Sequence, residues 1–414
     1  MTGFTEPDRD QGTGTGAGPL EGLVVADFSR VLAGPLASMF LADLGATVIK
    51  VERPGLGDDT RSWGPPHVGS LSTYFTSVNR NKRSVTLDLT DPEDLKLAHT
   101  LVERSDVFIE NFRPGKLSDF KLDPASLLAA HPKLVYCSVT GFGSTGGAHL
   151  PGYDFVVQAV GGLMSITGAE DGEPTKVGVA LVDVLTGLHA TISIQAALRH
   201  RDRTGQGQLV EVNLLSSLIA SLVNQGAAYI NGSPPPAAMG NQHPSIAPYE
   251  TLATKDNPIA VAVGNDRQFH TLARAIGRAE LSEDERFSAN VGRVANRREL
   301  ISELESTLRA APVAHWTQVL QDAGIPCGPV NDIAEAIALA SDLGLQPTAS
   351  FKGTAGAPTI ETLASPLRLS QNPVVYHRPP PQLGADTAEV REWLLGDGAA
   401  PLDADGRSKG PGRS

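Results

Sequence analysis

The stretch GLVVADFSRVLAGPLASMFLADLGATVIKVE, residues 22–52, decides the fold class. A short apolar run over residues 22–29 is followed by a turn at Ala33-Gly34-Pro35 and then by apolar residues at helical spacing over residues 36–44. A second apolar run covers residues 46–52. The pattern predicts a strand, a helix and a strand, and the helix has the length of a crossover between parallel strands.

The same rhythm continues downstream. Apolar strand-like runs recur at SVTLDL (84–89), DVFIENF (106–112) and LVYCSVTGFG (134–143). Between them, Asp91-Pro92 and Asp123-Pro124 are typical helix openings, with a capping carboxylate followed by proline in the first turn. Alternating strands and helices predict an α/β fold with a mostly parallel sheet covered by helices.

Composition along the chain predicts a division into parts. We expect a smaller α/β domain that contains a strand over residues 257–263, a helix after Asn265 and two helices between residues 296 and 323. The expected ranges are a flexible N-terminal tail (1–20), a large domain (21–205), a linker helix region (206–239), the small domain (240–330), a return to the large domain (331–398) and a flexible C-terminal tail (399–414).

Charge and cysteine content exclude several classes of protein. The net charge of -12 repels nucleic acids and anionic membrane surfaces. The N-terminus has no signal-peptide pattern, and we expect no membrane-spanning segment. The two cysteines do not form a paired zinc-binding pattern, and we expect no bound metal. These features favour a protein of the cytoplasm.

Basic and polar residues gather where the predicted strands end, which is where open α/β sheets bind ligands. The group consists of Arg30, Arg53, Lys82, Arg83, Asn111, Phe112 and Arg113. Arginine side chains bind phosphates in a bidentate manner, and a phenylalanine can stack on an adenine. The alternative interpretation is a set of solvated loop charges, and spacing alone does not decide between the two.

Asp183 is the only charged residue between Lys176 and His189, in an otherwise apolar run. A carboxylate in such surroundings is paired, hydrogen-bonded or functional, because isolated burial costs several kcal/mol. One interpretation is a helix N-cap ahead of a helix that begins near Val184. The other is a functional carboxylate, and an N-terminal position in a helix is compatible with both.

Two further segments carry polar residues with weaker signals. Tyr153 and Asp154 follow a Pro-Gly turn and precede an apolar helix, so a packed aromatic ring and a cap explain them equally well. The loop that contains Gly240, Asn241 and His243 combines a glycine with polar side chains, and a surface loop explains it without a catalytic role.

Taken together, the chain resembles the family III CoA-transferases (CaiB/BaiF type), which include formyl-CoA transferase, carnitine CoA-transferase and alpha-methylacyl-CoA racemase. The similar segments follow the family order from about residue 23 to 394. They are DFSRVLAGPLASMFLADLGATVIKVERPGLGDDTR (27–61), NRNKRSVTLDL (79–89), ENFRPG (110–115), TGFGSTG (140–146), GYDFVVQA (152–159), VALVDVLTG (179–187), RTGQGQLVEVNLLSS (203–217), GNQHPSIAPY (240–249) and GIPCGPV (324–330).

The resemblance implies a Rossmann-like large domain, ring-shaped chains and an interlocked homodimer. It also implies coenzyme A (CoA) and acyl-CoA as substrates, with no permanently bound cofactor. By motif position, Asp183 is the nucleophile, and Tyr153, Asp154, Gly240 and Asn241 belong to the active site. The implied CoA-binding residues are Leu32, Ala33, Arg53, Lys82, Arg83, Leu87, Asn111, Phe112, Arg113 and Lys116. Where many relatives carry Arg-Leu-Gly, this chain has Asp119-Phe120-Lys121, so Lys116 or Lys121 is expected to replace that arginine.

The implied reaction moves CoA from an acyl-CoA, such as succinyl-CoA, to a dicarboxylic acid through a mixed anhydride and an aspartyl-CoA thioester at Asp183. Arg30 or His243 could supply a cation for the second carboxylate of the acceptor. One alternative is an acyl-CoA racemase, but such relatives carry histidine where this chain has Tyr153, and a phenol with a pKa near 10 is a poor base at neutral pH. Another alternative is a CoA-binding protein without turnover.

Overall fold

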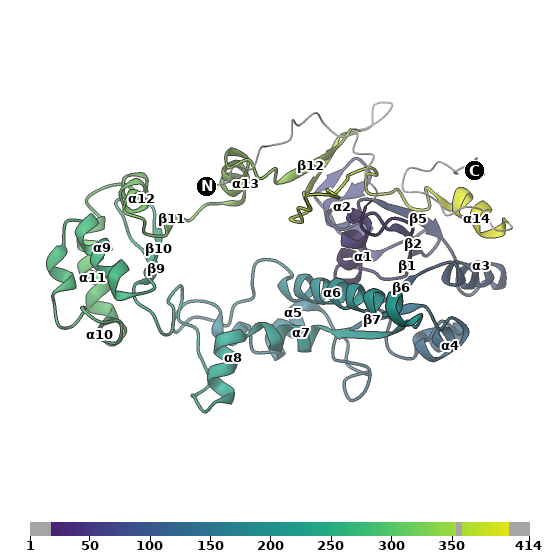
Figure 1. Cartoon of the computed structure of the whole chain (residues 1–414), viewed down its shortest axis with the longest axis horizontal. Helices are drawn as coiled ribbons and strands as arrows, with labels where there is room; N and C mark the ends of the chain where they lie inside the picture. The colour runs from purple at the N-terminus through teal and green to yellow at the C-terminus, as the bar shows by residue number, and fades with distance from the viewer. Residues whose placement is uncertain (1–17, 353–357, 397–414) are drawn as a thin grey trace. The chain divides into compact units, whose positions relative to one another are not determined.

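The computed structural model describes residues 18–352 and 358–396, which form two compact units (Figure 1). The first unit comprises the described residues up to Gly161, Gly178–Val223 and the residues from Gln346 onward. The second comprises Gly162–Val177 and Asn224–Leu345. Residues 331–345, which we expected in the large domain, therefore group with the second unit.

Most of the two expected tails lies outside the described residues. Residues 18–20 are the exception, and they do not belong to a flexible tail. The Leu20 backbone N–H donates to the Leu44 carbonyl over 3.0 Å, and the Leu20 side chain is buried.

The first unit is built on a six-stranded sheet in which every pair of neighbours is parallel. The strand order is β5-β2-β1-β6-β7-β8. The strands are β1 (Val24–Asp27), β2 (Thr47–Glu52), β5 (Lys82–Thr86), β6 (Val107–Glu110), β7 (Val135–Thr140) and β8 (Gln208–Asn213). The predicted α/β class with a parallel sheet is confirmed. The order reverses between β1 and β6, and in doubly wound sheets the ligand binds at this switch point, beyond the carboxyl ends of the strands.

Helices cover both faces of the sheet. The core on one face joins strand residues such as Ile49 and Phe108 to α3 (Pro92–Glu103), α4 (Pro124–Ala130) and α14 (Thr387–Leu395). On the other face, α1 (Ala33–Asp43) packs against β1 and β2, and α6 (Leu181–Thr204) packs against β7, β8 and α1. The chain thus returns after the second unit to add α14 beside α3 (Figure 1).

The helix starts follow local capping chemistry. The Asp91 carboxylate accepts hydrogen bonds from the backbone N–H groups of Glu93 and Asp94 at the start of α3. The Asp123 carboxylate accepts one from the backbone N–H of Ser126 at the start of α4, as predicted. Helix α1 begins at Ala33 and not at Leu36 as predicted. Ala33-Gly34-Pro35 has the composition of a turn, but proline also fits the first turn of a helix because its missing N–H has no partner to lose there.

The first unit contains further elements, among them the two-stranded antiparallel sheets β3-β4 and β12-β13. These further elements are β3 (His67–Val68), β4 (Leu71–Ser72), α2 (Thr73–Ser77), α5 (Asp154–Val160), α7 (Leu214–Ser221), β12 (Thr348–Phe351), β13 (Ile360–Leu363) and the 3₁₀ turns η1 (Asp59–Ser62) and η2 (Lys116–Phe120). A third 3₁₀ turn, η3 (Met164–Ile166), belongs to the second unit.

The second unit has an antiparallel sheet of order β11-β10-β9 and its own apolar core. The expected strand and helices are present: Asn265 caps α9, and α11 and α12 follow. The elements are α8 (Val223–Ile230), β9 (Tyr249–Leu252), β10 (Ile259–Ala262), α9 (Asp266–Ala275), η4 (Ala279–Ser282), α10 (Asn290–Ala295), α11 (Arg297–Leu308), α12 (Val313–Asp322), β11 (Cys327–Pro329) and α13 (Ile333–Asp342).

Helix α6 is long and apolar enough to cross a membrane, and it is the one helix among the described residues that meets this criterion. The expectation of no membrane-spanning segment stays a prediction, because a core helix of an α/β domain meets the same criterion of length and composition. In the structure α6 packs against β7, β8, α1 and α7, so it serves as a layer of the α/β domain.

Candidate active site

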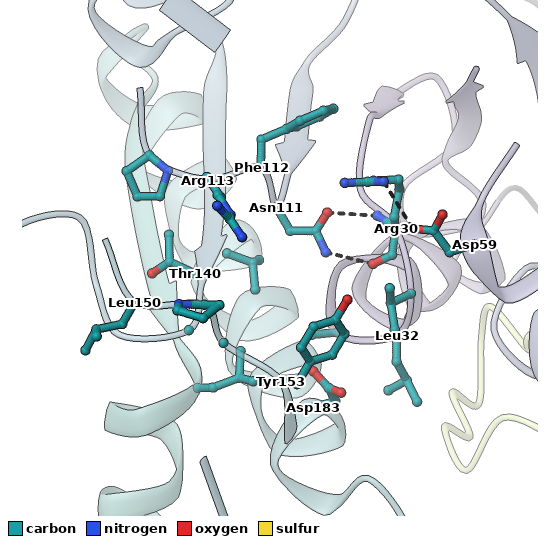
Figure 2. A pocket seen from close by; sticks show the side chains of 18 residues that line it. Arg30, Leu32, Asp59, Asn111, Phe112, Arg113, Thr140, Leu150, Tyr153 and Asp183 are labelled. Atoms are coloured by element: carbon teal, nitrogen blue, oxygen red, sulfur yellow. Dashed lines mark hydrogen bonds and ion pairs between the residues drawn. The ribbon is translucent and has the colours of Figure 1, made fainter. Parts of the chain in front are cut away.

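A cavity of about 330 Å³ opens beyond the carboxyl ends of β1, β6 and β7, at the switch point of the sheet (Figure 2). Residues from the loops after these strands meet α6 in its wall. The lining residues are Arg30, Val31, Leu32, Ala33, Asp59, Asn111, Phe112, Arg113, Pro114, Val139, Thr140, Gly141, Leu150, Pro151, Gly152, Tyr153, Asp183 and Leu214. We call this space the Asp183 cavity.

A second cavity of about 410 Å³ lies beyond β1 and β2. Its wall is mostly apolar and carries three arginines and one lysine. The lining residues are Phe28, Arg30, Val51, Glu52, Arg53, Gly57, Asp58, Leu87, Asp88, Leu89, Thr90, Phe112, Arg113, Lys116 and Phe120. We call it the apolar cavity. Arg30, Phe112 and Arg113 line both cavities, so the two adjoin at these side chains.

Asp183 lies in the first turn of α6 and is not its N-cap. The helix begins at Leu181 with Ala180 as the capping residue, so the expected start near Val184 was wrong. The carboxylate faces the Asp183 cavity, and among the described residues none donates a hydrogen bond or an ion pair to it. Burial, together with the nearby charge of Asp154, raises the pKa of Asp183 to about 7.

Asp154 holds the start of α6 from below. One of its carboxylate oxygens accepts hydrogen bonds from the backbone N–H groups of Val182 (2.8 Å) and Asp183 (3.3 Å). The other accepts one from Nε2 of Gln158 over 2.6 Å. Asp154 is buried and does not line the Asp183 cavity, so it positions Asp183 and caps α6, whereas the sequence suggested a cap of the following helix α5.

Tyr153 precedes Asp154 and is placed differently. Its side chain is 60% exposed and lines the same cavity as Asp183, and both lie toward one end of that cavity together with Leu32 (Figure 2). The neighbouring residues Tyr153 and Asp154 thus point in opposite directions, as successive residues entering a helix from extended backbone do.

Asn111 secures the loop after β1. Its Oδ1 accepts from the Arg30 backbone N–H over 2.9 Å, and its Nδ2 donates to the Arg30 carbonyl over 2.7 Å (Figure 2). The adjoining Val31 has φ of +71°, and its N–H donates to the Asp58 carboxylate. The amide that we expected to bind the nucleotide is therefore engaged with protein backbone, although Asn111 lines the cavity.

Lys82 and Arg83 do not reach either cavity, which corrects their assignment as CoA-binding residues. Lys82 is wholly buried, and its Nζ contacts a carboxylate oxygen of Asp27 (3.2 Å) and Oδ1 of Asn79 (2.9 Å). Nη1 of Arg83 pairs with Glu389 of α14 over 2.7 Å. Buried cations need such partners because their desolvation is otherwise uncompensated.

A second buried pair supports the loops at the cavities. Nζ of Lys50 lies 2.9 Å from the Asp58 carboxylate, and both side chains are inaccessible to solvent. Burial disfavours the charge of Asp58, but Lys50 and the hydrogen bonds from Thr60 outweigh it and lower the pKa of Asp58 to about 2. Asp58 therefore stays ionised, and it holds Val31 on one side and the start of η1 on the other.

The other CoA-binding candidates are distributed over the two cavities. Leu32 and Ala33 line the Asp183 cavity, whereas Arg53, Leu87 and Lys116 line the apolar cavity. Lys116 lines the apolar cavity and Lys121 lines neither cavity, and which lysine replaces the missing arginine stays a prediction.

Gly240 and Asn241 lie in the second unit, and their role at the active site stays a prediction. Gly240 has φ of +61°, and its N–H donates to the Gly168 carbonyl over 2.9 Å. The Asn241 side chain donates to Oγ1 of Thr251 over 3.0 Å. His243, the other expected acceptor-binding residue, packs its ring against Tyr249 and accepts a hydrogen bond from the Ser245 N–H.

Three polar residues near the site were not identified from the sequence. Asp59 lines the Asp183 cavity and pairs with both Arg30 and Arg53. Burial and the charges of Asp183 and Asp154 raise the pKa of Tyr74 to about 12, so its phenol lies within electrostatic range of Asp183. Burial raises the pKa of Glu110 to about 7, and its carboxylate accepts the Phe112 N–H over 2.8 Å. An acidic residue at the end of the apolar strand β6 was the available signal for Glu110.

The two cavities define the class of site. One offers an apolar wall with aromatic rings and cations, and the adjoining one contains a half-buried carboxylate that no cation neutralises among the described residues. No group of three or more His, Cys, Asp or Glu side chains suited to a metal occurs within residues 18–352 and 358–396. The arrangement suits an elongated ligand with an aromatic head, an anionic middle and an electrophilic end, on a doubly wound α/β domain.

Comparison with known proteins identifies the family. The family model for CoA-transferase family III matches residues 20–387, so the chain belongs to this family and is a CoA-transferase. The resemblance inferred from the sequence motifs is confirmed.

The sequence similarity to individual relatives extends over almost the whole chain. The chain is 42% identical to succinyl-CoA:glutarate CoA-transferase of Mus musculus over 382 residues, which is 91% of this chain and 86% of that protein. It is 42% identical to succinate–glutarate CoA-transferase of Agrobacterium fabrum, over 90% of this chain and 94% of that protein. The crystal structure of a CaiB/BaiF family protein from Brucella suis superposes with a TM-score of 0.82 and 42% identity, covering 91% of this chain and all of the other.

Proposed function

We propose that this enzyme transfers CoA from succinyl-CoA, or a similar dicarboxylyl-CoA, to a dicarboxylic acid acceptor such as glutarate, with Asp183 as the covalent relay. The observation that carries the mechanism is the half-buried Asp183 carboxylate, which faces the cavity without a neutralising cation among the described residues. The names of the two relatives at 42% identity support the choice of acids.

The reaction proceeds by two acyl exchanges at one carboxylate. The Asp183 carboxylate attacks the thioester carbonyl of the donor and the carbon–sulfur bond breaks. CoA is released as a thiolate, and a mixed anhydride of the succinyl group and Asp183 remains. The thiolate then attacks the Asp183 carbonyl carbon, which releases succinate and leaves an aspartyl-CoA thioester. The acceptor carboxylate attacks this thioester, and the same two steps in reverse give the new acyl-CoA and regenerate Asp183.

The raised pKa of Asp183 suits this role. Burial destabilises the anion relative to water, so the carboxylate is more basic than a solvated aspartate and a better nucleophile once ionised. Asp154 keeps the reacting residue in place through the two backbone N–H groups at the start of α6. A partly enclosed site also protects the anhydride and the thioester from hydrolysis.

The two cavities accommodate the parts of CoA in order. The adenine occupies the apolar cavity between aromatic and aliphatic side chains such as Phe112 and Leu87. The diphosphate crosses the cations shared by the two cavities, Arg30 and Arg113. The pantetheine arm then passes Leu32 and Ala33 and brings the thioester to Asp183.

We also propose the interlocked homodimer of ring-shaped chains and a cytoplasmic location. Large apolar side chains are exposed on α5, α6 and α7, among them Phe155, Ile192 and Ile219. Exposed apolar surface of this kind is typical of an interface that a second chain covers.

The proposed cytoplasmic location agrees with the state of the two cysteines. Both are free, as a reducing compartment requires.

The decisive experiment traps the aspartyl thioester. The protein and its Asp183→Asn variant are incubated with succinyl-CoA, and the adduct is captured with hydroxylamine and located by peptide mass spectrometry. We expect modification at Asp183 in the native protein only, and a loss of CoA transfer to glutarate of about a thousandfold or more in the variant, because the covalent route is removed.

Two controls sharpen this experiment. Asp202→Asn removes an exposed carboxylate that lines neither cavity, and it should leave both adduct and transfer unchanged. A branched acyl-CoA in deuterated water tests racemase activity, and we expect no exchange of the alpha proton. Full transfer activity in Asp183→Asn, or an adduct at another residue, would refute the proposed mechanism.

A further inference from the structure

Asp59 stands between two arginines where the two cavities adjoin. Its two carboxylate oxygens lie 3.1 Å from Nη1 of Arg30 and 3.2 Å from Nη2 of Arg53. All three side chains are between about one third and one half exposed, so they belong to the accessible wall and not to the core. In Figure 2 Asp59 lies beside Arg30 and apart from Asp183.

The backbone of Asp59 is held independently of these ion pairs. Asp59 is the first residue of η1, and the preceding Asp58 caps that turn by accepting the Thr60 N–H over 3.0 Å. Asp58 is in turn anchored by the buried Lys50. The turn therefore does not depend on the Asp59 carboxylate, and a change confined to that carboxylate leaves its support intact.

The Asp59 carboxylate accepts from one nitrogen on each guanidinium group, Nη1 of Arg30 and Nη2 of Arg53, and these are donors of the kind that a phosphate uses. Arg30 lines both cavities and Arg53 lines the apolar one, so their guanidinium groups stand where the diphosphate of a CoA thioester has to cross. Guanidinium N–H groups bind carboxylates and phosphates with the same geometry. A phosphate at these donors therefore shares them with Asp59 and lies within a few ångströms of a like charge, which opposes binding.

We propose that Asp59 is an internal counter-anion that weakens the hold of the enzyme on the diphosphate of CoA. In the free enzyme it neutralises one of the two arginine charges, and on binding it competes with the ligand for both. This inference rests on the proposed CoA-transferase function. Its consequence is that removing the Asp59 charge tightens the binding of CoA, although the carboxylate lies in the binding site.

The test measures the dissociation constants of CoA, 3′-dephospho-CoA and pantetheine by calorimetry for the native protein, Asp59→Asn and Asp59→Ser. We expect CoA and dephospho-CoA to bind about three- to tenfold more tightly to both variants, which is the size expected for one screened like-charge contact. Pantetheine, which has no diphosphate, should bind all three proteins equally. This split distinguishes a charge effect from a general change in the shape of the site.

Two matched variants complete the design. Asp59→Glu keeps the charge and should bind CoA within about twofold of the native protein, because ion-pair partners remain. Asp202→Asn removes one negative charge outside both cavities and should change nothing. Equal or weaker CoA binding by Asp59→Asn and Asp59→Ser, or the same gain with pantetheine or in Asp202→Asn, would overturn the inference.

Failure of this inference can be told apart from failure of the proposed function. If the native protein binds CoA but forms no adduct at Asp183, the transfer mechanism fails while the role of Asp59 is still decided by the dissociation constants. If the adduct forms and the Asp59 variants bind CoA no more tightly, only the inference about Asp59 fails. A native protein that does not bind CoA refutes both.

Discussion

At the scale of single residues, the neighbouring carboxylates of Asp154 and Asp183 have different roles because their surroundings differ. Asp154 is buried and saturated with hydrogen bonds from Val182, Asp183 and Gln158, so it remains an acceptor that organises the helix start. Asp183 lines the cavity, whereas Asp154 does not. No described residue donates a hydrogen bond to the Asp183 carboxylate. Burial and the Asp154 charge therefore act on its pKa without opposition, and the pKa rises to about 7.

The raised pKa predicts how activity depends on pH. Because only the ionised Asp183 is a nucleophile, kcat/KM for succinyl-CoA should increase as the pH rises toward about 7 and level off above it. The measurement is a rate profile from pH 5 to pH 9. Glu110 has a pKa of about 7 as well, so Glu110→Gln is the matched control and should keep the same profile. A profile without an ionisation between pH 6 and pH 8, or one that loses it in Glu110→Gln, contradicts the assignment to Asp183.

The raised pKa of Asp183 also makes the stability of the fold depend on pH. The folded protein binds a proton at Asp183 more tightly than the unfolded chain, so ionisation of Asp183 lowers the stability of the fold. Asp183→Asn should therefore be more stable than the native protein, by an amount that grows from about pH 4 to about pH 7 and is constant above. Thermal unfolding over this range measures it. A variant that is less stable at pH 8 than the native protein would contradict the expected sign.

At the scale of elements, the buried pairs below the strand ends explain why the binding loops keep their form. Lys50 of β2 neutralises Asp58 ahead of η1, and Lys82 of β5 neutralises Asp27 at the end of β1. The Lys82–Asp27 pair joins two strands across 55 positions of sequence, and the Lys50–Asp58 pair joins β2 to the segment that follows it. Breaking such a pair leaves a charge without compensation in a site that water does not reach.

Lys50→Met should therefore lower the free energy of unfolding by about 3–5 kcal/mol, because Asp58 loses its cation while it remains buried. Urea unfolding followed by circular dichroism is the measurement. The double variant Lys50→Met/Asp58→Asn removes both charges and should recover part of the loss. If the single variant is as stable as the native protein, the pair does not support these loops.

At the scale of the whole molecule, large apolar side chains of α5, α6 and α7 are exposed in the single chain, and the proposed dimer accounts for this surface. Ile192 on α6 is 65% exposed in the middle of a helix whose other face packs on the sheet. A role of α6 as a membrane span explains this exposed surface less well than a covering partner chain. Helix α6 carries Asp183 in its first turn, beside the cavity, and therefore belongs to the active site.

The proposed interlocked dimer makes a specific prediction about subunit exchange. Rings that pass through each other cannot separate without opening, so tagged and untagged dimers mixed under native conditions should form no mixed dimers. Mixed dimers should appear only after unfolding and refolding together, because unfolding and dissociation are then a single process. Affinity capture of the tag after mixing is the measurement. Mixed dimers within hours at neutral pH, or a folded monomer on dilution, would contradict interlocking.

The amino-acid sequence alone was enough to predict the alternation of strands and helices, the parallel sheet, the unusual position of Asp183 and the family. These properties depend on hydrophobic periodicity, on capping chemistry and on ordered motifs, all of which are local in the chain. Only the tertiary structure decided what the charged residues contact. Arg53 follows β2 and lines a cavity, whereas Lys82 and Arg83 begin β5, and their partners Asp27 and Glu389 lie 55 and 306 positions away in the sequence. Long-range packing of this kind decides whether a charged side chain binds a ligand or a neighbouring side chain. Residue type alone therefore does not predict the partner.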